Sequence, residues 1–136
     1  MQDVDIDGFV VAVAVVVVRG ARVLALRRAL TKDAGPGLWE TVSGRLEHDE
    51  QPRDAAIREA LEETGLDVSI GDAPVDAYTA QRAGRPMVVI VYRGDSTDGD
   101  VVISDEHDRH AWWTPEEFRE RSSLTRLADA VDRAMG

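Results

Sequence analysis

The most apolar stretch of the chain runs from Phe9 to Val18 and reads FVVAVAVVVV. Its β-branched valines favour an extended backbone. Because the run does not alternate between apolar and polar residues, it predicts a strand that is buried on both faces. A turn at Gly20-Ala21 and a second apolar run, Val23 to Leu26, then predict a hairpin.

The clearest helix is predicted over Pro52 to Thr64. Pro52 suits the first turn of a helix, where its missing N–H costs nothing, and Gly65 suits the left-handed residue after the last turn. The apolar spacing places four residues on one face, which we expect to be the buried one: Ile57, Ala60, Leu61 and Thr64.

Short strands and further helices complete the pattern. Strands are predicted at Trp39–Val42, Val75–Arg82, Met87–Arg93, Val101–Ile103 and Ala111–Trp113. Thr114, followed by a proline and two acids, predicts a helix start, and Leu124 to Met135 predicts a terminal helix. This order of elements indicates a mixed α/β fold with helices against a curved sheet. A length of 136 residues fits a single domain, which we predict over residues 1–136.

Charge and composition narrow the classes of partner. The formal net charge is -10, and such a surface repels nucleic-acid polymers and anionic membranes, so we expect neither as a partner. A phosphate substrate would need a local cation, which is either Arg or Lys or a metal. The chain has no cysteine, which excludes disulfides and thiolate metal sites.

The location suggested by these features is the cytoplasm. Ten apolar residues are too few to span a bilayer as a helix. The first seven residues, MQDVDID, are acidic and therefore unlike the basic start of a signal peptide.

Three acids gather on the predicted central helix. Glu59, Glu62 and Glu63 lie within an arc of about 100° around the helix axis. Carboxylates one turn apart repel each other, and a hard divalent cation would relieve that repulsion. A solvated acidic face is the alternative. Ala55 and Ala56 lie on or beside the same arc, which favours close packing or a pocket floor over a free surface.

The segment around these acids resembles a known motif. Residues 44 to 66, GRLEHDEQPRDAAIREALEETGL, match the Nudix box at every fixed position, with the small Ala60 at an aliphatic one. The matching residues are Gly44, Glu50, Arg58, Glu59, Glu62, Glu63, Gly65 and Leu66. Such a match arises by chance on the order of once in 10⁸ starting positions at background residue usage. The resemblance implies a Nudix-type α/β/α sandwich with a curved mixed β-sheet and a MutT-like hydrolase.

The same resemblance implies roles for individual residues. Glu59, Glu62 and Glu63 would hold Mg²⁺, with Mn²⁺ as a substitute, and the Ser43 backbone carbonyl would be an additional ligand. Ser43 stands where family members often have glycine, which puts the local turn in question. Arg58 would chiefly order the turn between the loop and the helix, together with Glu50.

The resemblance leaves the general base open. Glu63 is one candidate, and an acid from the loop Ser104–His107 is another, because related enzymes often supply one from there. Glu106 is favoured over Asp105, as base or as metal ligand, and a solvated loop acid is the alternative.

Other side chains could contact a substrate. Tryptophans can stack on a base and basic residues can bind phosphates, although packing and solvated surface charge are the favoured interpretations. These candidates are Trp39, Trp112, Trp113, Arg27, Arg28 and Lys32.

The resemblance implies magnesium-dependent cleavage of a diphosphate bond in a nucleoside triphosphate or a nucleoside diphosphate-linked compound. The partner is thus a small nucleotide or nucleotide-sugar-like molecule, and a homodimer is a family-level expectation. One alternative is a catalytically silent, nucleotide-binding regulatory module, which usually lacks box glutamates. Another is an isomerase of the isopentenyl-diphosphate type, which normally needs a cysteine.

Overall fold

The computed structural model describes residues 8–136, so the acidic segment that argued against a signal peptide lies outside the described residues. The strands are β1 (Val10–Arg19), β2 (Arg22–Arg28), β3 (Trp39–Glu40), β4 (Val42–Arg45), β5 (Ser69–Ile70), β6 (Asp76–Arg82), β7 (Arg85–Asp95) and β8 (His107–Trp113). The helices are α1 (Pro52–Thr64), α2 (Pro115–Arg121) and α3 (Thr125–Met135).

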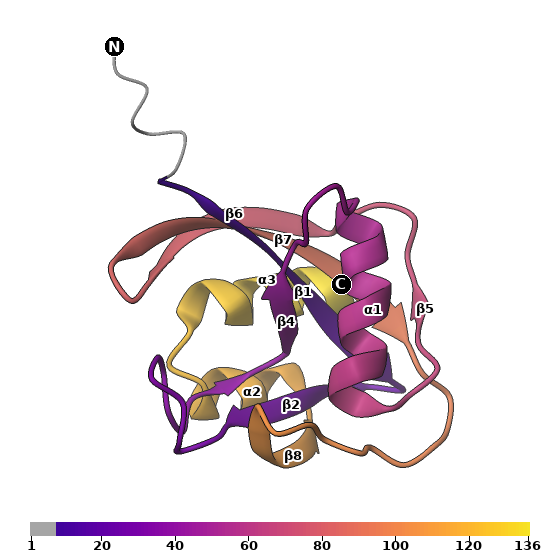
Figure 1. Ribbon diagram of the computed structural model, residues 1–136. Coiled ribbons are helices and arrows are strands. Elements are labelled where there is room, and N and C mark those ends of the chain that lie inside the picture. The colour runs from indigo at the N-terminus through magenta and orange to yellow at the C-terminus, as the bar shows by residue number, and fades with distance from the viewer. Residues whose placement is uncertain (1–7) are drawn as a thin grey trace.

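The strands form one mixed sheet around β1 (Figure 1). One edge of β1 pairs in parallel with β7 over nine residues, from Val10 to Val18. The other edge pairs antiparallel with β4 in its first half and with β2 at its end. β2 continues to β3 and β8, and β7 continues to β5 and β6.

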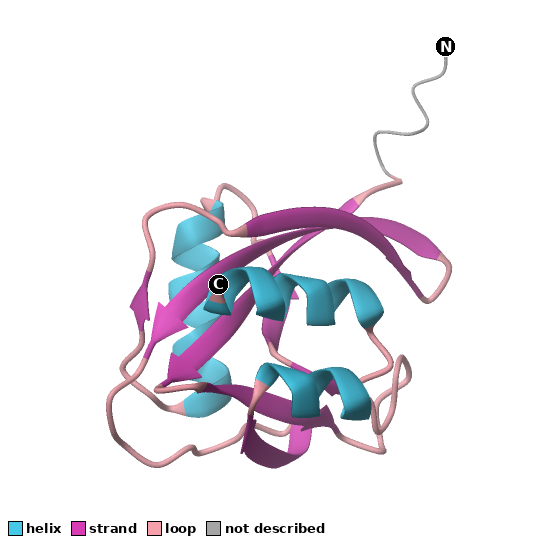
Figure 2. Ribbon diagram, turned by 180° about the vertical axis from the view of Figure 1, so that it is seen from behind, coloured by secondary structure: helices cyan, strands magenta, loops and turns pink. Residues whose placement is uncertain are grey.

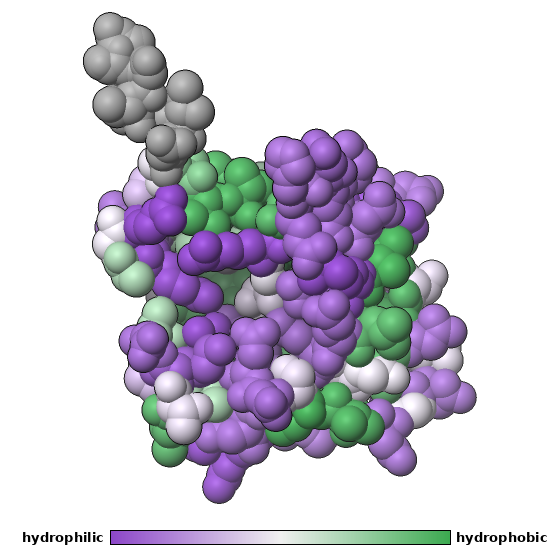
Figure 3. Space-filling view, viewed as in Figure 1, coloured by the Kyte–Doolittle hydropathy of each residue, from purple (hydrophilic) through white to green (hydrophobic). Residues whose placement is uncertain are grey.

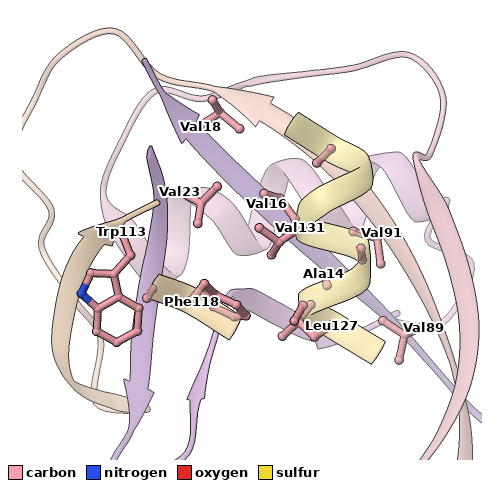
Figure 4. Close-up of a cluster of buried hydrophobic side chains, with 14 of the residues drawn as sticks. Ala14, Val16, Val18, Val23, Val89, Val91, Trp113, Phe118, Leu127 and Val131 are labelled. Carbon is pink, nitrogen blue, oxygen red and sulfur yellow. The ribbon is translucent and has the colours of Figure 1, made fainter. Parts of the chain in front are cut away.

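Helices cover both faces of this sheet, α1 on one and α2 with α3 on the other (Figures 1 and 2). Alternate residues of β1 enter two separate cores. Val13, Val15 and Val17 pack with α1, whereas Ala14, Val16 and Val18 pack with α2 and α3 around Phe118 and Val131 (Figure 4). The predicted α/β/α sandwich and the strand buried on both faces are therefore confirmed.

The predicted buried face of α1 is correct at Ala60 and Thr64 and wrong at Ile57 and Leu61. Ile57 and Leu61 are 41% and 61% exposed. The full set of buried residues on α1 is Ala55, Ala56, Glu59, Ala60, Glu63 and Thr64. The helix lies close to β1 and β4, where alanines fit and larger side chains would hold the backbones apart. The expectation of close packing at Ala55 and Ala56 is confirmed, because both are fully buried.

The strand predicted at Val101–Ile103 is also absent from the described residues, which are irregular there. The Val102 N–H donates to the Thr64 carbonyl at 2.8 Å, so the segment satisfies one of the free carbonyls at the end of α1. No helix among residues 8–136 is long and apolar enough to cross a membrane.

The predicted helix start at Thr114 is confirmed as a capping box. The Thr114 hydroxyl accepts a hydrogen bond from the Glu117 N–H, and the Glu117 carboxylate accepts one from the Thr114 N–H at 2.9 Å. We expect Thr114→Ala to lower the free energy of unfolding by about 1 kcal/mol, measured by urea denaturation. The exposed Thr97 provides the control, since Thr97→Ala should change stability by less than about 0.5 kcal/mol. Equal stabilities of the two variants would contradict this account of α2.

Candidate active site

The turn from β4 into α1 passes directly against the acidic helix. A Cβ added at Gly44 would collide with the Glu59 carboxyl group. The backbone therefore approaches this carboxylate more closely than any other residue would allow. This packing explains the glycine at the start of the box in physical terms.

The three box glutamates lie in different environments. Glu59 and Glu63 are 8% and 2% exposed and face the sheet, whereas Glu62 is exposed. The Ser43 N–H donates to Glu63 Oε1 at 3.2 Å. The structure thus places two carboxylates against the turn at Ser43 and a third at the surface.

Burial sets the protonation of this pair. Desolvation raises the pKa of Glu63 to about 9 against the lowering effect of the Ser43 N–H, and the nearby charges of Glu59, Glu40 and Glu106 raise it further. Burial likewise raises the pKa of Glu59, although Arg58 opposes it. Two carboxyl groups held this way need a positive partner to ionise together.

Arg58 connects the acids of the box to the loop before α1. Its guanidinium donates to both Glu50 oxygens, at 2.8 and 2.9 Å, and contacts Glu59 at 3.1 Å and Glu62 at 3.3 Å. The fork-shaped pairing lowers the pKa of Glu50 to about 2. These contacts match the ordering role that the resemblance implies for Arg58 and Glu50.

A cavity of about 1030 Å³ opens beside these acids. Figure 3 shows a hollow next to α1, with an apolar floor and a hydrophilic rim. In a chain with net charge -10, this lining gathers more bases than acids. The bases are Arg28, Lys32, Arg45, Arg82, Arg85 and Arg126, and the acids are Asp33, Glu40, Glu59 and Glu106.

The structure shows which of the remaining charged residues proposed from the sequence lie at the cavity. Glu106 lines the cavity and pairs with Lys32 at 3.5 Å, while Asp105 is not part of the lining. Arg28 is buried and pairs with Glu40, so its interpretation as a solvated edge charge is wrong. Arg27 pairs with Asp108 away from the lining.

The tryptophans are packing residues. Within residues 8–136, the cavity lining includes none of the three. Trp113 packs on Trp39, with ring centroids 4.5 Å apart, and Trp112 lies under the Arg19 guanidinium on the other face of β8.

Sequence reasoning missed several residues that line the cavity. Glu40 is buried where β3 ends, Arg82 comes from the β6–β7 hairpin, and Arg126 of α3 lies over the Tyr78 ring at 4.8 Å. A charged residue inside the short apolar segment Trp39–Val42 was a usable signal for Glu40. The other residues are brought together by the fold from distant parts of the chain.

The donor set fits a hard divalent cation. All its donors are oxygens, and two of its carboxyls, those of Glu59 and Glu63, are buried. Arg58 is the positive group that touches Glu59 and Glu62 in this structure. Among the described residues no three His, Asp or Glu side chains already form a compact metal cage. The Glu62 carboxylate instead contacts Arg58 at 3.3 Å.

Comparisons with known proteins agree with this geometry. The NUDIX domain model matches residues 8–133. A MutT-like protein from Streptomyces ambofaciens is 39% identical over 128 residues, covering 91% of this chain and 78% of that protein. The CTP pyrophosphohydrolase of Escherichia coli is 30% identical over 105 residues, covering 77% and 76%.

The fold agrees with solved structures as well. The crystal structure of a MutT protein from Methanosarcina mazei matches with a TM-score of 0.83 at 23% identity, over 93% of this chain and 92% of that one. The family match over nearly the whole chain, the complete box and the shared fold lead to one conclusion. This chain belongs to the Nudix family of hydrolases.

Proposed function

We propose that the protein hydrolyses a diphosphate bond in a nucleoside triphosphate, in a Mg²⁺-dependent reaction that releases a nucleoside monophosphate and pyrophosphate. The observation that carries this proposal is the buried carboxyl of Glu59, which lines a large cavity rich in basic residues, with the buried carboxyl of Glu63 on the same helix. The names of the relatives, which include a CTP pyrophosphohydrolase, support a nucleotide substrate. A nucleoside diphosphate-linked compound is the alternative substrate of the same class.

The metal ligands in this proposal are Glu59, Glu62, Glu63 and the Ser43 backbone carbonyl, with Glu106 as a further ligand if it is not the base. Mn²⁺ would substitute for Mg²⁺. A bound divalent ion neutralises phosphate oxygens and acidifies water. Binding would also allow Glu59 and Glu63 to ionise together, which their burial alone disfavours.

The chain's own residues supply binding and proton transfer. Arg28, Lys32 and Arg82 would contact the phosphates, because these basic residues line the cavity. Glu106 would take the proton of the attacking water. The water oxygen forms the new bond to phosphorus, and the bridging P–O bond breaks with its electron pair on the departing pyrophosphate.

Composition and charge also bear on the domain organisation, the location and the partners of the protein. We infer that the chain forms a single domain over residues 1–136, acts in the cytoplasm and binds no nucleic-acid polymer. The absence of cysteine and the net charge of -10 support the last two points. The homodimer stays a prediction.

A substrate screen tests the proposal. With Mg²⁺ present we expect at least one nucleoside triphosphate to yield its monophosphate and pyrophosphate, identified by chromatography, and we expect EDTA to stop the reaction. Mn²⁺ should restore activity after EDTA treatment. Tight nucleotide binding without hydrolysis would instead favour a regulatory module.

A further inference from the structure

A buried histidine beside Glu106 has no role in the reaction as described so far. His107 and Glu40 have side chains that are 1% and 3% exposed, and His107 Nε2 lies 2.8 Å from Glu40 Oε2. The buried His107 Nδ1 has no hydrogen-bond partner. Because a carboxylate only accepts hydrogen bonds, we assign the proton to Nε2, which donates to Glu40.

The sheet is deformed where this histidine enters the interior. β8 pairs with β2 through Arg27↔Arg109 and then Arg28↔His107, so Asp108 is an extra residue in a β-bulge. Bulges turn side chains that a regular strand would place elsewhere. Here His107 is buried, while Asp108 is exposed.

His107 is joined to both sides of the site, to Glu106 through the chain and to Glu40 through a hydrogen bond. Next to it, the Glu106 carbonyl accepts from the Ala29 N–H at 2.9 Å. Beyond it, Glu40 contacts the Ser43 hydroxyl at 3.4 Å, and the Ser43 N–H donates to Glu63. A chain of contacts therefore runs from the loop of Glu106 through the buried His107 and Glu40 to the half-buried Ser43 at the box glutamates.

We propose that His107 is a positioning residue that, through Glu40, holds the Glu106 carboxylate toward the box glutamates. This inference rests on the proposed function, because it assigns His107 a role through Glu106. His107 itself does not line the cavity, so it touches no substrate. Residues that orient a catalytic or metal-binding group in this way typically contribute about 10–100-fold to activity or metal affinity.

Two variants of similar size separate the hydrogen bond from packing. His107→Gln keeps an N–H that reaches Glu40, whereas His107→Leu removes it. We expect His107→Leu to lower kcat by about 10–100-fold with little change in KM. In His107→Gln, kcat should return close to the wild-type value. His110→Leu, at an exposed position of the same strand, should leave kcat unchanged. If the Leu variant does not fold, His107→Asn replaces it, because its shorter side chain does not reach Glu40.

A double-mutant cycle decides whether the effect passes through Glu106. In a Glu106→Gln background, His107→Leu should change kcat by less than about threefold, since the group that it positions is already gone. If His107→Leu lowers kcat equally in the wild-type and Glu106→Gln backgrounds, the proposal is overturned. It is also overturned if kcat in His107→Gln is as low as in His107→Leu.

Amide hydrogen exchange tests the inference without metal, substrate or activity. The Ala29 amide, which donates to Glu106, should exchange at least about tenfold faster in His107→Leu and at the wild-type rate in His107→Gln. Unchanged exchange in the Leu variant would refute the positioning role even if the protein hydrolyses nucleotides. If the Ala29 amide exchanges faster in His107→Leu but the wild-type protein hydrolyses no nucleotide, the positioning role is supported and only the proposed reaction is rejected.

Discussion

Glu62→Gln and Glu63→Gln should each reduce kcat by about 10³-fold or more. A metal ion that stabilises charge on a transferring phosphate contributes several kcal/mol, and each 1.36 kcal/mol corresponds to about a tenfold change in rate. Glutamine keeps the size of glutamate but is a poorer ligand without charge. The measurement is steady-state release of pyrophosphate at saturating nucleotide and Mg²⁺.

Stability separates loss of the metal site from loss of the fold. Burial disfavours the charged form of Glu63, so Glu63→Gln without metal should be at least as stable as the wild type. Mg²⁺ should raise the Tm of the wild type and not that of the variant, since a ligand stabilises only the state that binds it. The exposed Glu120 of α2 offers a matched control, and Glu120→Gln should behave like the wild type. Normal turnover in both box variants would reject the metal helix.

Glu106→Gln should slow turnover by about 10²–10⁴-fold, the range of a general base. Glu106 lines the cavity, and its charge is one of those that raise the pKa of Glu63. Glutamine cannot accept the proton of the attacking water. The rate of the chemical step should be measured in a single turnover, so that product release does not mask it.

Asp105 is the matched control for this result. It is the neighbouring acid and is exposed, so Asp105→Asn should keep a rate close to that of the wild type. If Asp105→Asn is slow and Glu106→Gln is not, the general base has been assigned to the wrong residue. If both are normal, Glu63 becomes the candidate base.

Much of the architecture was readable from local patterns. The unbroken apolar run from Phe9 to Val18 predicted a strand buried on both faces, because neither side of it is polar, and β1 occupies Val10–Arg19. Pro52 and Gly65 marked the ends of α1, since each suits a backbone conformation that helix ends require. The spacing of the box also predicted that Glu59, Glu62 and Glu63 share an arc of the helix.

The rotation of α1 about its own axis was decided by the tertiary structure alone. Periodicity shows which residues share a face, but the opposing surface selects the face that is buried. Here the turn at Gly44 and the strand β1 lie so close that Ala55, Ala60 and two glutamates fit against them, and Leu61 remains in solvent.

The composition of the cavity was likewise a result of the fold. Arg28, Glu40, Arg82 and Arg126 come from four different elements, and their local sequences carry no shared spacing. The bulge at Asp108 buries His107, although its neighbours in sequence are polar. Local sequence thus determined the elements and the order of the acids, because backbone preferences act over a few residues. Tertiary packing decided which charges meet, because that depends on residues far apart in the chain.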